Sequence, residues 1–128
     1  MMMKFHHIGV ACENIQEVIV FLENTFNIIK KSKIIWHDIQ GVDACLLTNA
    51  DGSNIELVSG KSIESFVNKK QFLYHSCWEV DDLEIAIKSF VDNDSVLISE
   101  PTPSLLFNNR KVAFLYTNIG ILELLESE

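Results

Sequence analysis

The sequence is poor in basic residues. Ten Lys and Arg face 18 Asp and Glu, so the formal net charge is −8 at pH 7. Binding to a phosphate backbone needs a basic face, and we therefore exclude a nucleic-acid partner. The few cations lie in short groups such as Lys30–Lys33, Lys69–Lys70 and Arg110–Lys111. An anionic substrate would have to be held by one of these groups, although a solvated face with ordinary solubilising charges is the favoured interpretation of them.

Long apolar runs are also missing. None approaches the roughly 20 residues that a membrane-spanning helix needs, so we expect no membrane partner. Residues 1–5 lack the apolar segment of a signal peptide. The three cysteines, Cys12, Cys45 and Cys77, form neither an even disulfide set nor a CxxC pair. We therefore expect a cytoplasmic protein with buried, reduced thiols.

What the chain has is enough apolar material for one domain. Apolar residues make up 48% of its 128 residues, including eight Phe and two Trp. Residues 4–12 read as a strand, and Asn14 then caps a helix whose apolar side chains recur at helical spacing as far as Phe26. Glu17 completes a box-like start of this helix. Strands are predicted at 28–37, 42–49 and 53–59, with a tight turn at Asp51-Gly52.

The second half repeats this order after a linker helix over 61–71. A strand is predicted at 72–80, then a helix capped by Asp81 or Asp82, then strands near 96–99, 111–117 and 120–126. Pro101 and Pro103 predict a loop before the penultimate strand. The pattern predicts an α+β fold in a single domain over 1–128, in which two tandem βαβββ modules, 1–60 and 72–128, form a cupped mixed sheet.

One motif occurs in both modules. His7 and His75 each lie in the first strand, and Glu56 and Glu123 follow them by 49 and 48 positions, as in an internal duplication. A Glu inside an apolar strand is costly to bury unless it is paired or binds a cation. Imidazole and carboxylate together suit a divalent Zn, Ni, Co, Mn or Fe ion. Alone, each residue would more often be a satisfied core histidine or an exposed carboxylate, but the matched set of four predicts one metal site.

The same residues resemble a known family. The segments His7–Ala11, Ile55–Val58, His75–Asp82, Lys111–Leu115 and Glu123–Glu126 look like the vicinal oxygen chelate superfamily of glyoxalases, bleomycin-resistance proteins and extradiol dioxygenases. Within it, the chain is most similar to methylmalonyl-CoA epimerase-like and glyoxalase I-like proteins. The resemblance covers essentially the whole chain and implies one divalent metal held by His7, Glu56, His75 and Glu123, commonly in a homodimer.

The resemblance also implies a reaction. The metal would act as a Lewis acid on a small 2-oxo or acyl-thioester compound while a carboxylate moves a proton beside the carbonyl, as in an isomerase, epimerase or lyase. Glu123 is the first candidate for this catalytic base and Glu56 the second. Arg110 and Asn109 are candidates to hold a substrate anion. Trp78 is a candidate pocket residue, although aromatic residues in strands are usually core.

Departures from the family pattern keep other functions open. Residues 69–73 and 107–110 replace Gly-rich stretches in loops that would shape the substrate pocket. One alternative is a dioxygenase with two histidines and one carboxylate on iron, which the additional Glu56 and the short chain disfavour. Another is a metal-free protein that binds or sequesters a small molecule, which the complete set of four ligands disfavours.

Overall fold

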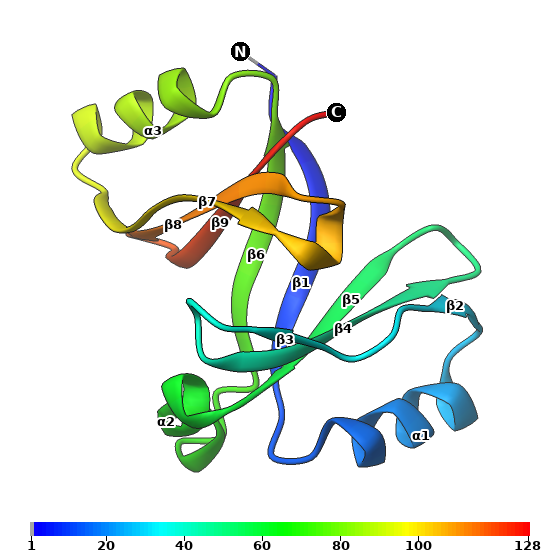
Figure 1. Ribbon diagram of the computed structural model, residues 1–128. Coiled ribbons are helices and arrows are strands. Elements are labelled where there is room, and N and C mark those ends of the chain that lie inside the picture. The colour runs from blue at the N-terminus through cyan, green and yellow to red at the C-terminus, as the bar shows by residue number, and fades with distance from the viewer. Residues whose placement is uncertain (1) are drawn as a thin grey trace. The chain divides into compact units, whose positions relative to one another are not determined.

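The computed structural model describes residues 2–128, and Figure 1 shows its helices and strands. The chain divides into two compact units, which we describe separately. The first unit is His7–Tyr74, and the second comprises the residues up to His6 together with His75–Glu128. The strands β1 (Lys4–Ala11) and β6 (Leu73–Val80) each run across this division.

The first unit packs one helix on one face of a small mixed sheet. Its further elements are α1 (Ile15–Thr25), β2 (Ile28–Lys31), β3 (Ile35–His37), β4 (Val42–Asn49), β5 (Asn54–Ser59), the 3-10 turn η1 (Lys61–Ile63) and α2 (Glu64–Asn68). Both β2 and β3 pair with β4, which lies antiparallel to β5, and β5 is parallel to β1. The apolar side chains of α1, among them Ile15, Ile19 and Leu22, pack on Leu47 and Leu57 of the sheet.

The second unit has the same plan. It contains α3 (Leu83–Asp92), β7 (Val96–Ser104), the 3-10 turn η2 (Leu105–Phe107), β8 (Arg110–Thr117) and β9 (Gly120–Glu126). The strand order is β6-β9-β8-β7, with β6 parallel to β9 and the other pairs antiparallel. Leu83 and Ile87 of α3 pack on Leu115 and Leu124 of the sheet. The predicted α+β class is therefore confirmed, and the second half has the predicted order of helix and strands, whereas the first half has one strand more than predicted.

Both predicted helix caps are present. The Asn14 side chain accepts a hydrogen bond from the Glu17 backbone N–H at 3.1 Å. Asp82, rather than Asp81, accepts the matching bond from Ile85 N–H, also at 3.1 Å. Each cap satisfies one of the backbone donors that a helix leaves free in its first turn. The same chemistry thus begins the helix of each unit.

The prediction of one strand over 28–37 was wrong. The structure has β2 and β3 with Ser32 between them, where the Ser32 hydroxyl accepts a hydrogen bond from the Leu46 N–H at 2.9 Å. The Ser32 N–H in turn donates to the Leu46 carbonyl at 2.8 Å. A side-chain oxygen therefore replaces a backbone carbonyl in the ladder to β4. The strand is interrupted there.

The prediction of a loop at Pro101 and Pro103 was also wrong. β7 continues through both prolines to Ser104, with irregular register between Ser99 and Thr102. Proline lacks an N–H donor, and in sheets it is confined to edge strands and bulges. β7 pairs with β8 alone, so the missing donors cost no ladder bond on its free side.

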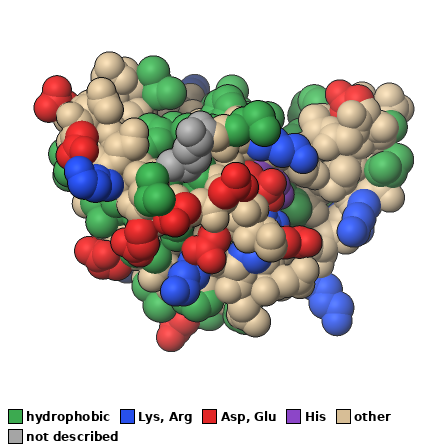
Figure 2. Space-filling model, turned by 90° about the horizontal axis from the view of Figure 1, so that it is seen from above, with side chains coloured by type: hydrophobic (Ala, Val, Ile, Leu, Met, Phe, Trp, Pro, Cys, Tyr) green, Lys and Arg blue, Asp and Glu red, His purple; other side chains and the backbone are tan. Residues whose placement is uncertain are grey.

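The exposed surface carries both hydrophobic and charged side chains. On the face shown in Figure 2, hydrophobic side chains lie among charged ones and form no single block. The helices found between residues 2 and 128 are too short or too polar to cross a membrane.

Candidate functional site

The first unit holds His7 and Glu56 side by side. His7 lies in β1 and Glu56 in β5, and 3.3 Å separates His7 Nε2 from Glu56 Oε1. Their side chains are 0% and 8% exposed. β1 alternates between its faces, so His7 points away from the face on which Ile8 and Val10 pack toward α1. The pair therefore belongs to the sheet face that α1 does not cover.

The second unit holds the matching pair. His75 of β6 and Glu123 of β9 approach to 3.2 Å between Nε2 and Oε1, and their side chains are 0% and 3% exposed. This pair also lies on the sheet face opposite the helix, because Leu122 and Leu124 on either side of Glu123 pack toward α3. Burial of a carboxylate at this depth requires a partner or a cation.

Both pairs are built on the same strand register. Glu56 lies opposite Gly9 on the parallel strand β1, two residues beyond His7. Glu123 lies opposite Cys77 on β6, two residues beyond His75. A small residue thus stands beside each Glu, and the imidazole reaches along the strand to the carboxylate. The sequence duplication is therefore also a duplication of geometry.

The donor atoms fit a divalent metal. Zn–N and Zn–O bonds are about 2.0–2.2 Å long, so two neighbouring ligands at tetrahedral or right angles have donor atoms about 3 Å apart. The Nε2–Oε1 separations of 3.3 and 3.2 Å match this value. The same distances also fit a hydrogen bond between a protonated imidazole and a carboxylate. Each pair by itself supplies two ligands, fewer than a structural or catalytic zinc site uses.

Phe114 contacts the second pair. Its ring lies edge-on to the His75 ring, with 5.5 Å between centroids, and it stands opposite Glu123 in the β8–β9 ladder. Such an edge contact restricts the orientation of the imidazole. Its position on the same sheet face as Glu123 follows from the register, which sequence reasoning alone did not supply.

Trp78 is on the opposite face of β6 from His75. Its ring meets Phe5 edge-on at 5.2 Å, and its indole N–H donates to the Ser76 hydroxyl at 3.0 Å. It also packs against the core beneath α3. These packing contacts explain the position of the Trp78 side chain. Its predicted contact with a substrate stays a prediction.

Arg110 is already engaged by protein groups. Its guanidinium pairs with Glu79, and its Nε donates to the Glu126 carbonyl at 2.8 Å. Asn109 is exposed, has φ 64°, and donates its backbone N–H to the Ser104 carbonyl at 2.8 Å. These contacts give both residues structural roles, and their predicted binding of a substrate anion stays a prediction.

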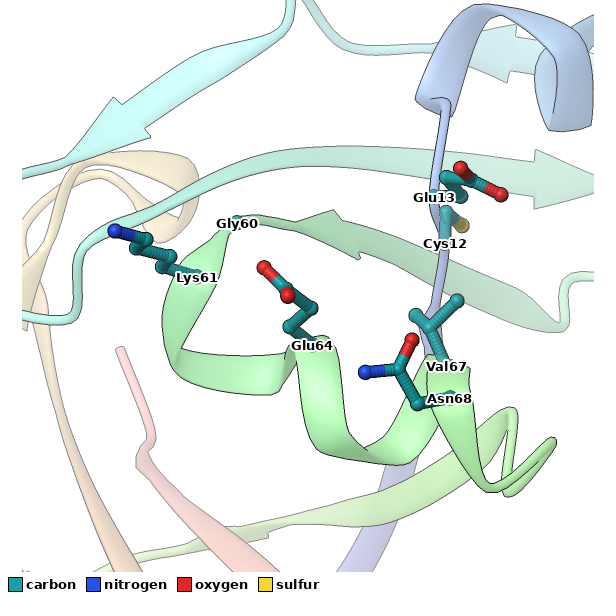
Figure 3. Close-up of a pocket in the computed structure, with 7 residues that line it drawn as sticks. All are labelled: Cys12, Glu13, Gly60, Lys61, Glu64, Val67 and Asn68. Carbon is teal, nitrogen blue, oxygen red and sulfur yellow. The ribbon is translucent and has the colours of Figure 1, made fainter.

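A separate hollow of about 380 Å³ opens at the far end of β1 in the first unit. Figure 3 shows its lining residues, which are Cys12, Glu13, Gly60, Lys61, Glu64, Val67 and Asn68. None of them belongs to a His–Glu pair. Its charged groups are exposed, so the hollow resembles an open polar cleft more than a built binding site.

All three cysteines are buried and lie outside any disulfide, as predicted. Burial raises the pKa of the Cys12 thiol to about 11 and also raises the pKa of Cys45. Thiolate, the reactive form, is therefore scarce near neutral pH at both positions. The cytoplasmic location inferred from these cysteines stays a prediction.

Comparison with known proteins places the chain in a family. Residues 6–114 match the model of the Glyoxalase/Bleomycin resistance protein/Dioxygenase superfamily. The chain belongs to this superfamily. The resemblance read from the two His–Glu motifs is thereby confirmed.

Its relatives include epimerases. The chain is 28% identical to the mitochondrial methylmalonyl-CoA epimerase of Dictyostelium discoideum, over 98% of this chain and 78% of that protein. Among solved structures, a hypothetical protein from Bacillus halodurans C-125 is 25% identical with a TM-score of 0.80, over 100% of this chain and 96% of that one. Methylmalonyl-CoA epimerase from Mycobacterium tuberculosis is 18% identical with a TM-score of 0.84, over 98% and 88% of the two chains. These structures show that the fold is that of the superfamily.

The contacts of Glu79 and Arg110 were missed by sequence reasoning. A signal was available, because Glu79 lies in an apolar strand and shares the face of His75 by alternation. Its partner is 31 residues away in the sequence, on a strand that is not its neighbour in the sheet. Only the strand order reveals that pairing.

Proposed function

We propose that this protein is a divalent-metal-dependent epimerase of a short acyl-CoA thioester, with methylmalonyl-CoA as the first compound to test. Similarity to the Dictyostelium epimerase over 98% of this chain and 78% of that protein supports the substrate class. Two buried His–Glu pairs with the same register support the metal site.

The four side chains His7, Glu56, His75 and Glu123 are the proposed ligands of one ion. Each unit contributes an imidazole and a carboxylate, a donor set that suits Zn, Ni, Co or Mn. Two ligands from one unit would leave an ion mostly hydrated, whereas four protein ligands would hold it more firmly and still leave it open to substrate oxygens. The proposal therefore joins both pairs in a single site, either within one chain or between two chains of a homodimer.

The reaction needs a proton to leave one face of a carbon and return to the other. The bound ion supplies Lewis acidity, which lowers the pKa of the C–H bond beside the thioester carbonyl. We assign Glu123 as the base that takes this proton, with the C–H electron pair passing into conjugation with the carbonyl. Glu56, which starts the cycle protonated, then gives its proton to the opposite face, and exchange with water returns both carboxyl groups to their starting states. Two carboxylates from two modules supply the acceptor and donor that inversion requires.

Deuterium exchange tests this assignment. When the Co²⁺-loaded protein is incubated with methylmalonyl-CoA in deuterated water, the substrate should incorporate deuterium at C2 and its two epimers should reach equilibrium. NMR measures the deuterium exchange, and optical rotation measures the approach of the epimers to equilibrium. Glu123→Gln should lower both rates by about 10²–10⁴-fold, the usual contribution of a general base. Glu56→Gln should retain part of the exchange while losing inversion.

Two results would reject the proposal. If metal-loaded protein exchanges no proton of methylmalonyl-CoA, the acyl-CoA substrate is wrong. Exchange with a 2-oxo hemithioacetal instead would favour a glyoxalase-type lyase. If no candidate exchanges and the chain binds no metal, the protein is a metal-free binding protein.

Association into a homodimer is a part of this proposal that can be measured separately. Several large apolar side chains are exposed, including Ile39 at 79% and Leu73 at 71%. Burying such side chains in an interface is favourable. Analytical ultracentrifugation should find a mass of about twice 14.6 kDa.

A further inference from the structure

Arg110 joins three strands of the second unit on the sheet face that carries His75 and Glu123. It starts from β8, donates from Nε to the Glu126 carbonyl of β9 at 2.8 Å, and pairs through Nη2 with Glu79 of β6. β9 lies between β8 and β6, so the side chain crosses the whole width of β9. We call the Arg110–Glu79 pair, with its bond to the Glu126 carbonyl, the strap.

The strap lies on the same face as the His–Glu pair. Glu79 follows His75 and Cys77 on one side of β6 by alternation. Arg110 shares its side of β8 with Phe114, which stands opposite Glu123 and touches the His75 ring. Glu79 itself stands opposite Leu125, two residues beyond Glu123. The strap thus clamps β6 to β9 immediately beyond the pair that these strands carry.

The two charged side chains of the strap are mostly screened from water. The Arg110 and Glu79 side chains are 14% and 22% exposed, whereas Lys88 and Asp92 in α3 form an ion pair with 77% and 60% exposure. A charge pair removed from solvent has stronger Coulomb attraction than one in water. Arg also holds two acceptors at once through its planar fork of donors, which Lys does not do. The contact therefore restrains strand register more than a surface ion pair does.

The first unit has no strap at the same positions. The register of β1, β5 and β4 places Ala11 where the second unit has Glu79, and Val42 where it has Arg110. Both are buried apolar side chains, at 1% and 3% exposure. The two His–Glu pairs are duplicated, and the strap is not. Its role is therefore particular to His75 and Glu123.

We infer that Arg110 and Glu79 are positioning residues that hold β6 and β9 in the register at which His75 meets Glu123. The effect of these residues on catalysis rests on the proposed function, because Glu123 is the proposed base. Their positioning of the His75–Glu123 pair should hold in the metal-free protein as well. Loss of the strap should therefore loosen the second pair and leave His7 and Glu56 unchanged.

Nitrogen NMR of the histidine rings tests this directly. In metal-free, ¹⁵N-labelled protein at one fixed pH, Arg110→Gln and Glu79→Gln should each shift or broaden the His75 ring signals while those of His7 stay in place. His7→Gln and His75→Gln variants assign the signals. Lys88→Gln is the matched control, since it removes the same charge from an exposed pair in the same unit. The charge-reversed double variant, Glu79→Arg with Arg110→Glu, should restore part of the His75 signal.

Metal affinity provides the second readout. Strap variants should weaken Co²⁺ binding by about 10-fold, at the low end of the effect of residues that orient metal ligands. If the His75 ring is unchanged in both variants, or if His7 changes equally, the strap does not position the second pair. If Arg110→Gln does not fold, Glu79→Gln, which keeps the bond from Arg110 to Glu126, decides the question. A wild-type protein that binds no Co²⁺ would reject the proposed function, and the His75 ring signals of the two strap variants would then decide the positioning role by themselves.

Discussion

Glu123 lies on the strand next to His75 and two residues further along, which brings Glu123 Oε1 to 3.2 Å from His75 Nε2. His7 and Glu56 repeat the relationship at 3.3 Å. The two buried imidazole–carboxylate pairs share their strand register and their Nε2–Oε1 distance, and quantitative predictions about metal binding follow from this.

One ion per chain is expected if both pairs serve the same site. Mass spectrometry of native protein loaded with Co²⁺ should give this stoichiometry. His7→Gln and His75→Gln should each weaken binding by more than about 100-fold, because loss of a ligand exceeds the 10–100-fold effect of an outer partner. Two ions per chain, or a variant that keeps half of the metal at full affinity, would show independent sites.

The two helix caps should contribute similar stability. Asn14→Ala and Asp82→Ala each remove a side-chain acceptor at 3.1 Å from a first-turn N–H. We expect each to lower the free energy of unfolding by about 1 kcal/mol, measured by urea denaturation. Asn14→Asp, which keeps an acceptor oxygen, is the control and should stay near wild type. A loss from Asn14→Asp as large as that from Asn14→Ala would contradict the role of the acceptor.

Gly60 should resist substitution. Its φ is 145°, and a Cβ atom placed there would lie 2.6 Å from the Gly41 carbonyl oxygen. Gly60→Ala therefore combines backbone strain with a clash and should cost at least about 2 kcal/mol of unfolding free energy. Gly52→Ala is the matched control, since Gly52 has φ 88° and no atom within 4 Å of the added Cβ. Strain alone should cost about 1 kcal/mol there, and equal losses would argue against the clash.

Asp51 predicts a pH dependence of stability. Hydrogen bonds from Ser53 and Asn49 lower the pKa of Asp51 from 3.8 to about 2. The unfolded chain therefore binds this proton more readily than the folded one, and the stabilisation is present above about pH 4 and lost as the pH falls toward 2. Asp51→Ala should be less stable than wild type at neutral pH, and the difference should shrink across this window.

Urea midpoints over a pH series measure the Asp51 effect. Ser53→Ala removes the hydroxyl that donates to Asp51 at 2.6 Å and keeps the backbone donor at 3.0 Å. It should show the same trend with a smaller amplitude. A stability difference for Asp51→Ala that is constant from neutral pH down to 2 would contradict the assigned pKa.

Local features could be predicted from the sequence. Asn14 and Asp82 cap helices through bonds to residues three positions away. Asp51-Gly52 forms its turn with φ 88° at Gly52. The shared face of His7 with Gly9 follows from strand alternation. In each case the interacting atoms are close in the chain, so residue type and spacing suffice.

Features that depend on which strands are neighbours could not be predicted. The break at Ser32 depends on its bonds to Leu46 across the ladder. The extension of β7 through Pro101 and Pro103 depends on its position at the edge of the sheet. From the sequence alone, the two prolines predicted the end of a strand, and nothing near Ser32 predicted a break.

The sequence by itself determined the class of the fold, the repeated helix start and the candidate metal ligands, because hydrophobic periodicity, caps and a duplicated motif are local signals. Tertiary structure alone decided that Glu56 and Glu123 reach their histidines across parallel strands, and that Arg110 is occupied by Glu79. Contacts between distant segments depend on strand order and register. These follow from packing of the whole core and are not contained in any short stretch of the chain.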